Sequence, residues 1–196
     1  MTNPEKNEAR MNALTKAATF LSKFIEIAYT IGAVSMAVCL ILFLVDRELV
    51  SGSGDPGQEL AVHGFSLVCV NPDGTLNSAA CVIFFVTAGL ILELMAWVFR
   101  NVNLILRTTQ GLTKFSRGKT PFQKDNVRML REIGIFFLSV TVVEFAASSL
   151  VFLLVGPENA EVSAGVQSAA TGILMLCLSQ VFALGVWMQA DVDGLV

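Results

Sequence analysis

The chain has 196 residues, of which 54% are hydrophobic and only 15% are charged, with a formal net charge of -3 and a mean hydropathy of +0.68. Soluble domains carry about 25% charged residues, so this composition excludes an ordinary soluble domain. The apolar residues lie in long uninterrupted blocks and not in amphipathic stripes, which is typical of segments that cross a lipid bilayer.

A membrane span needs roughly 20 consecutive, mostly apolar residues. The segments that meet this requirement, without Lys or Arg in their interiors, are about 25–45, 79–99, 133–155 and 165–188. The sequence therefore predicts an all-α fold, a single membrane-embedded four-helix bundle. Residues 11–28 have apolar side chains at helical spacing, which indicates either an interfacial helix or an early start of the first span.

The basic residues are distributed unevenly along the chain. Of the 13, one is Arg47 and the others lie before the first span or in the loop 100–132: Lys6, Arg10, Lys16, Lys23, Arg100, Arg107, Lys114, Arg117, Lys119, Lys124, Arg128 and Arg131. Because translocation of Lys and Arg is disfavoured, the sequence predicts that this loop and both termini are cytoplasmic. The loops 46–78 and 156–164 are then external. Membrane insertion accounts for the basic loop, which lacks stacking aromatics, so we expect no direct nucleic-acid binding.

The first external loop has the features of a short strand or hairpin. Phe65 to Val70 is apolar and β-branched, and residues 71–74 form a turn sequence. This element could pack on the outer end of the bundle or receive an extracellular ligand. Cys69 and Cys81 both fall on the external side, and whether they form a disulfide depends on the redox state of the compartment.

The cytoplasmic loop is predicted to form helical extensions of the second and third spans. The second span is expected to continue to Gly118, with apolar residues packed under the bundle: Leu104, Leu106, Leu112 and Phe115. The sequence Thr120-Pro121-Phe122-Gln123 has the pattern of a capping box, with Thr120 as the N-cap and Gln123 at the third helical position. The third helix is therefore expected to start at Thr120.

Polar side chains occur inside the predicted spans at Glu93, Glu144 and Gln180. Because no intramembrane cation can pair with these acids, all three side chains should face the bundle interior, near one layer. They form either a proton, cation or polar-ligand site, or hydrogen bonds that fix the helices. The sequence contains no catalytic motif, no metal-ligand spacing and no internal repeat of the kind found in transporters, so we expect neither enzymatic activity nor a cofactor.

Two sequence motifs lie where the predicted spans meet the cytoplasm. The first consists of Gly118, Pro121, Phe122, Asn126, Leu130, Arg131 and Gly134, and the second of Gln180, Phe182, Gly185, Val186 and Gln189. Together they resemble the G-x-PF…N…LR-x-IG and Q-x-F…GV…Q motifs of the bacterial four-span membrane family of unknown function typified by YoaS. The chain departs from that family at Ala183 and Leu184, where a basic and an aromatic residue are common, and in its shortened acidic tail.

The resemblance implies a bacterial cytoplasmic membrane protein of no established activity, with a small cytoplasmic helix-turn-helix regulator as its partner. We therefore expect a non-enzymatic regulator or sensor that docks a cytoplasmic protein on the face around 100–131 and 189–196. The alternative is a small transporter, channel subunit or immunity protein that uses the intramembrane carboxylates. A third hypothesis is that the protein is a structural subunit of a larger membrane complex. The sequence does not decide whether the chain forms homo-oligomers.

Overall fold

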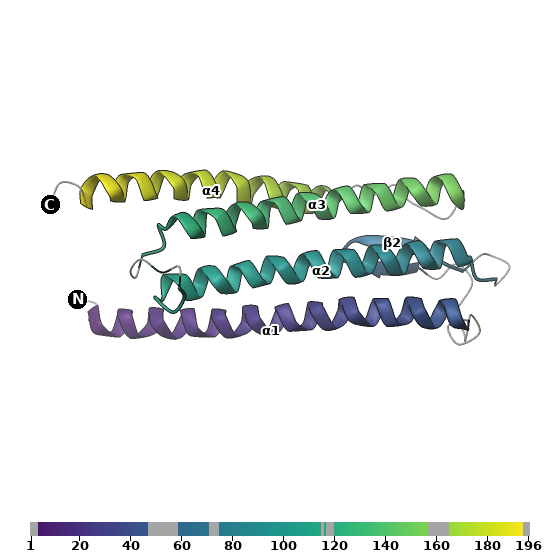
Figure 1. Ribbon diagram of the computed structural model, residues 1–196, viewed down its shortest axis with the longest axis horizontal. Coiled ribbons are helices and arrows are strands. Elements are labelled where there is room, and N and C mark those ends of the chain that lie inside the picture. Colours follow the sequence, from purple (N-terminus) through teal and green to yellow (C-terminus); the bar gives the residue numbers. More distant parts are fainter. Residues whose placement is uncertain are drawn as a thin grey trace. The chain divides into compact units, whose positions relative to one another are not determined.

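The computed structural model describes residues 4–46, 59–70, 75–114, 116, 120–156 and 165–193. Within these residues the elements, in chain order, are α1 (Pro4–Val45), β1 (Glu59–Val62), β2 (Phe65–Val68), α2 (Ser78–Thr109), α3 (Lys124–Leu154) and α4 (Val166–Asp193) (Figure 1). The predicted site residue Gly118, the turn sequence 71–74 and the external segment 157–164 lie outside the described part of the chain.

All four described helices are long and apolar enough to cross a membrane, which confirms the predicted all-α class. The α1 helix has 42 residues, or about 63 Å at about 1.5 Å per residue. It is unbroken from Pro4 to Val45. Residues 11–28 and the first predicted span therefore belong to one continuous helix.

The prediction that α2 continues to Gly118 is wrong, because the helix ends with a capping motif at Gly111. Gly111 has a φ of 79°, its N–H donates to the Thr108 carbonyl at 3.1 Å, and the Leu112 N–H donates to the Arg107 carbonyl at 2.9 Å. These bonds form a Schellman motif, which satisfies the last carbonyls and stops the helix. Leu112 is 61% exposed, so it does not pack under the bundle as predicted.

The predicted start of α3 at Thr120 is also wrong, since the helix begins at Lys124. Gln123 precedes it, and its carbonyl accepts the first helical hydrogen bond, from the Val127 N–H at 3.1 Å. The Gln123 side chain donates to the Thr120 carbonyl at 2.8 Å, so a separate turn forms in place of a capping box. The helical extensions predicted between the second and third spans therefore exist, but both are shorter than expected.

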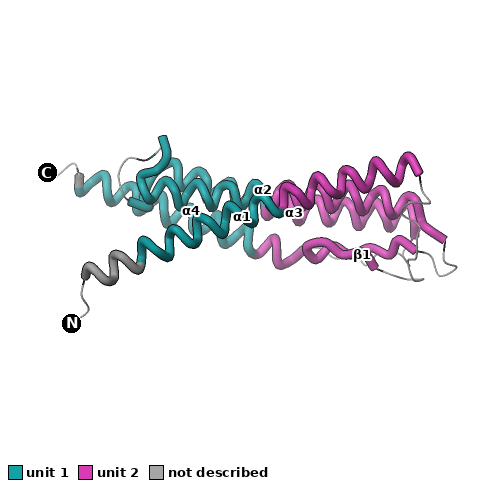
Figure 2. Tube along the Cα trace, turned by 90° about the horizontal axis from the view of Figure 1, so that it is seen from below, with its two compact units in different colours: residues 1–28, 96–136, 171–196 teal, residues 29–95, 137–170 magenta. Residues whose placement is uncertain are grey.

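The chain divides into two compact units, which are described separately (Figure 2). Unit 1 comprises Met1–Ala28, Ala96–Phe136 and Thr171–Val196, and unit 2 comprises Tyr29–Met95 and Phe137–Ala170. Unit 1 buries many polar side chains: Ser22, Asn101, Asn103, Thr108, Gln123, Asn126 and Ser179. The largest buried side chains of unit 2 are mostly apolar: Phe43, Leu67, Ile91, Val140 and Val151. Every basic residue except Arg47 belongs to unit 1.

The predicted external hairpin is present in unit 2. Strands β1 and β2 pair antiparallel, with Val62 opposite Phe65, and the turn between them is His63-Gly64. Both turn residues have positive φ, 53° and 93°, as a type I′ turn requires. The Phe65 ring stacks on Phe84 of α2 at a centroid distance of 6.2 Å, and Leu67 is buried. The hairpin therefore packs on α2, and the turn that joins its two strands lies at His63-Gly64, before Phe65.

Candidate functional site

The two sequence motifs meet in unit 1, where the turn before α3 packs on α4. The Phe122 ring lies over Gly185, in the space that a Cβ on that residue would occupy. The same ring lies 5.5 Å from the Phe182 ring, centroid to centroid. The Thr120 hydroxyl donates a hydrogen bond to the Gln189 side-chain oxygen at 3.0 Å. We call this set, Thr120, Phe122, Phe182, Gly185 and Gln189, the motif contact.

The turn that carries Phe122 is held by its own hydrogen bonds. The Phe122 N–H donates to the Thr120 hydroxyl at 3.2 Å, and the Asn126 amide donates to the Pro121 carbonyl at 2.9 Å. Asn126 is only 1% exposed, and its Oδ1 atom has no hydrogen-bond partner among the described residues. Burial of an unpaired acceptor is unfavourable, so Asn126 supports the turn at a cost in free energy.

Of the remaining motif residues on α3, two are buried and one is exposed. Leu130 and Gly134 are buried, whereas Arg131 is exposed and forms no ion pair with a described residue. A Cβ on Gly134 would lie 2.9 Å from the Gly172 carbonyl oxygen and 2.8 Å from Leu176 Cγ. At Gly134, α3 and α4 therefore approach each other closely, as small residues in membrane helices permit.

A polar contact between α1 and α2 was missed by the sequence reasoning. The Asn103 amide donates to the Thr19 carbonyl at 2.8 Å and to the Ser22 hydroxyl at 3.2 Å, and the Gln110 amide donates to the Thr19 hydroxyl at 3.0 Å. The sequence did carry a signal for this contact. Thr19 and Ser22 lie at helical spacing, as do Asn103 and Gln110, and both pairs are close to basic residues. These bonds hold the two helix ends together within unit 1.

Of the predicted intramembrane cluster, only Glu144 is buried. Its side chain is 2% exposed and its carboxyl group lies against Gly165, in the space of a missing Cβ, while Oε2 has no partner among the described residues. The Thr141 hydroxyl donates to the Gly165 carbonyl at 3.3 Å. Gly165 immediately precedes α4, so the acid lies at a helix N-terminus, where negative charge is favoured.

The prediction that Glu93 and Gln180 also face the bundle interior is wrong, because both are exposed. Glu93 lies on the same face of α2 as Leu90 and Trp97, which are 51% and 47% exposed. Gln180 lies on the α4 face of Leu184 and Trp187, which are also exposed. Glu93 belongs to unit 2 and Gln180 to unit 1, so the structure does not join the three residues into one site.

The structure brings Cys69 and Cys81 together in unit 2. Cys69 and Cys81 are both buried, both are free thiols, and the Cys81 sulfur lies 4.0 Å from the Cys69 carbonyl oxygen. The hydrogen bond with Cys81, together with burial, raises the pKa of the Cys69 thiol well above its usual range. The contact joins the chain just after β2 to the first turn of α2.

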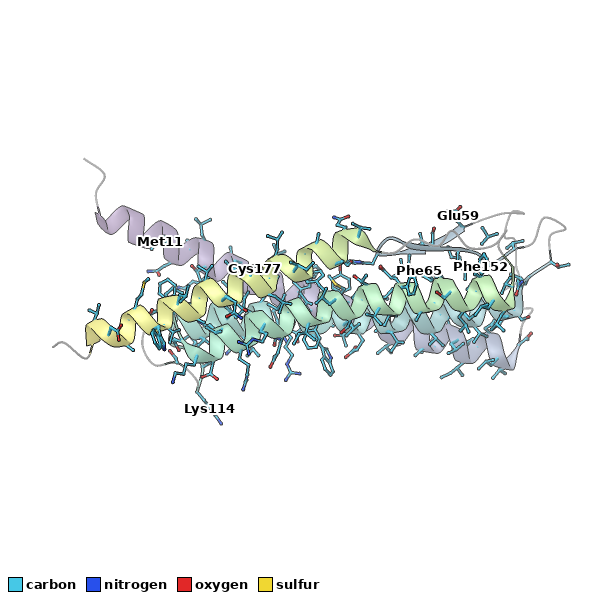
Figure 3. All side chains as sticks on the ribbon, turned by 90° about the horizontal axis from the view of Figure 1, so that it is seen from above. Met11, Glu59, Phe65, Lys114, Phe152 and Cys177 are labelled. Atoms are coloured by element: carbon cyan, nitrogen blue, oxygen red, sulfur yellow. The ribbon has the colours of Figure 1, made fainter. Side chains whose placement is uncertain are left out.

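Large apolar side chains project from the described helices, as Figure 3 shows along the ribbon. In unit 2 a groove of about 380 Å³ lies between α2 and α3 and is lined by Val82, Ile83, Val86, Thr87, Leu90, Val143, Ala146, Ala147 and Leu150. Among the described residues there is no group of three or more His, Cys, Asp or Glu side chains that could hold a metal ion.

No protein-family model, no curated protein and no solved structure matches this chain. The class of protein is therefore defined by the fold, which is that of a helical multi-pass membrane protein.

Proposed function

We propose that this protein is a non-enzymatic membrane regulator that docks a cytoplasmic protein at its basic end. The observation that supports this proposal is the motif contact, in which two segments about 60 residues apart in the sequence form one surface of unit 1. The contact holds the partly exposed Phe122 ring in place, as a docking surface requires.

Phe122 is suited to act as the anchor of such an interface. It is 40% exposed, and its turn is already held by Thr120 and Asn126. A rigid aromatic side chain costs little conformational entropy when a partner covers it, and such residues dominate interface energetics. Arg131 is exposed on α3 further along the chain, and its positive charge favours a partner with a complementary acidic surface.

The sequence resemblance supports a small helix-turn-helix regulator as the partner, and the excess of basic residues in unit 1 supports a cytoplasmic position for this surface. On this proposal the bacterial cytoplasmic membrane holds the chain with both termini inside. The external hairpin then faces the envelope, where a condition or ligand could act on it.

The test is chemical cross-linking in native membranes followed by affinity purification of the full chain. Phe122→Ala should reduce recovery of the partner at least 30-fold, the equivalent of a loss of about 2 kcal/mol at a hot spot. Asn126→Ala, which removes the support of the turn, should weaken recovery by a smaller factor. Phe152→Ala, a change of an exposed aromatic residue in unit 2, is the matched control. Recovery of no cytoplasmic partner, with wild-type behaviour of both variants, would contradict the proposal.

A second candidate function is transport, channel activity or immunity that uses an intramembrane carboxylate. Burial of Glu144 with an unpaired oxygen favours it, because acids inside membrane bundles mark proton and ion pathways. Glu144→Gln keeps the shape and removes the charge, so it should abolish ion flux or peptide resistance. Survival of that activity in the variant would leave Glu144 a structural residue.

A further inference from the structure

A second groove in unit 1 lies between the start of α3 and the later part of α4. Its volume is about 210 Å³, and its lining residues are Lys124, Val127, Ala183, Val186 and Trp187. Small-molecule sites usually have volumes of about 300–1,000 Å³. The groove is therefore too small for a whole ligand of that kind, but it fits a narrow apolar segment such as part of an acyl chain.

One basic residue, Lys124, lines this apolar groove and has no counter-charge among the residues that the structure describes. Its side chain is exposed. Arg128, one turn further along α3, lies 3.4 Å from Glu132 and is already partly neutralised. A ligand that places an anionic group beside Lys124 would supply the missing charge.

The register of α3 and α4 places apolar and basic side chains at the same level in unit 1. Gly134 contacts Leu176, and Phe122 contacts Gly185, so the α4 segment between these contacts runs antiparallel beside the basic first turns of α3. From Val181 onward, α4 exposes large apolar side chains: Val181, Leu184, Trp187 and Met188. The exposed fraction of Trp187 is 75%, and tryptophan is enriched where membrane meets water.

We propose that this groove, which we call the α3–α4 groove, binds an anionic glycerophospholipid. Its acyl chain lies along Val127, Ala183 and Val186, and its phosphate is held by Lys124. An amphipathic anion satisfies the apolar lining and the unpaired cation together, as basic pockets between membrane helices do for anionic headgroups. A protein helix would cover the apolar lining but would need an acidic residue placed at Lys124. The inference goes beyond the proposed docking function and does not depend on it.

The experiment is native mass spectrometry of the full chain in detergent, titrated with dioleoyl phosphatidylglycerol and, separately, with dioleoyl phosphatidylcholine. Phosphatidylglycerol should be retained on the folded chain and should bind more tightly than phosphatidylcholine. Lys124→Gln should weaken phosphatidylglycerol binding about fivefold, which corresponds to one basic residue near an anionic lipid surface. Lys114→Gln is the matched control, because Lys114 is exposed near the end of α2 and does not line the groove.

Ala183→Phe should fill the apolar lining and reduce binding of both lipids, and circular dichroism of each variant verifies that its helices are intact. Because the Lys124 variant changes only an exposed side chain, it tests the proposal even if the Ala183 variant does not fold. Equal affinity for the two lipids, or equal effects of the two lysine changes, would overturn the proposal. A dimer cross-linked through Val186→Cys would also overturn it, because a second copy would then cover the groove.

Discussion

At the scale of single residues, two glycines matter because a neighbouring side chain fills the space that a Cβ would take. Gly165 leaves room for the Glu144 carboxyl group, and Gly185 leaves room for the Phe122 ring. The sequence placed Gly165 at the start of the fourth predicted span. It could not show that the neighbour is an acid, because that depends on how α4 is aligned beside α3 in unit 2.

The contact between Glu144 and Gly165 can be measured with a double-mutant cycle. Gly165→Ala should lower the free energy of unfolding by about 1–3 kcal/mol, because overpacking forces the buried carboxyl group to move. In a Glu144→Ala background the same change should cost about 0.5 kcal/mol or less, since the space is then free. The measurement is denaturant unfolding in detergent micelles. Equal costs in the two backgrounds would mean that the carboxyl group does not hold this position.

At the scale of elements, helix ends were the least accurate part of the sequence prediction. Gly111 and Gly118 both follow an apolar segment in the sequence. Gly111 forms the Schellman bonds that stop α2, and Gly118 lies outside the described residues. Thr120 was the predicted N-cap and Gln123 the predicted third helical residue, but Gln123 precedes the helix and its side chain donates to the Thr120 carbonyl. Local patterns identify the residues that favour a helix end, but they do not decide between neighbouring alternatives.

The attachment of the turn before α3 to α4 is an element-scale prediction. Thr120→Cys with Gln189→Cys should be joined by a short bifunctional thiol cross-linker, because the hydroxyl of Thr120 and the side-chain oxygen of Gln189 lie 3.0 Å apart. Adding Gly185→Val should reduce the yield at least severalfold, since the new side chain displaces the Phe122 ring that holds the turn. Mass spectrometry of the digested protein measures the yield.

Gly111→Ala is a suitable control, because it alters the helix end in the same loop without touching α4. A yield that is insensitive to Gly185→Val would show that the ring does not determine the position of the turn.

At the scale of the whole molecule, the sequence predicted four apolar helices, and the structure has them. Hydropathy and length gave the helical membrane class, which the described helices confirm. The orientation of the chain in the membrane is still a prediction, and it rests on the excess of Lys and Arg in unit 1.

Orientation can be measured by labelling single cysteines in a variant without the four native cysteines. Glu59→Cys on the exposed edge of the hairpin should react with a membrane-impermeant maleimide in intact cells. Lys114→Cys should react only after the cells are permeabilised, because the positive-inside rule keeps basic loops in the cytoplasm. A reporter fused after Val196 should be active only as a cytoplasmic enzyme. The opposite labelling pattern would reverse the topology and remove the basis for a cytoplasmic partner.

The sequence by itself determined that this chain has long apolar helices, a short strand or hairpin segment near Phe65, and basic residues concentrated before the first span and in the loop 100–132. It could do so because hydropathy, length and charge are properties of consecutive residues. Only the tertiary structure decided which side of each helix is buried. Glu144 faces inward, whereas Glu93 and Gln180 do not. A span that is apolar on all sides has no sequence signal for its rotation about its own axis. That rotation, like the pairing of Phe122 with Gly185, is set by packing between residues that are distant in the sequence.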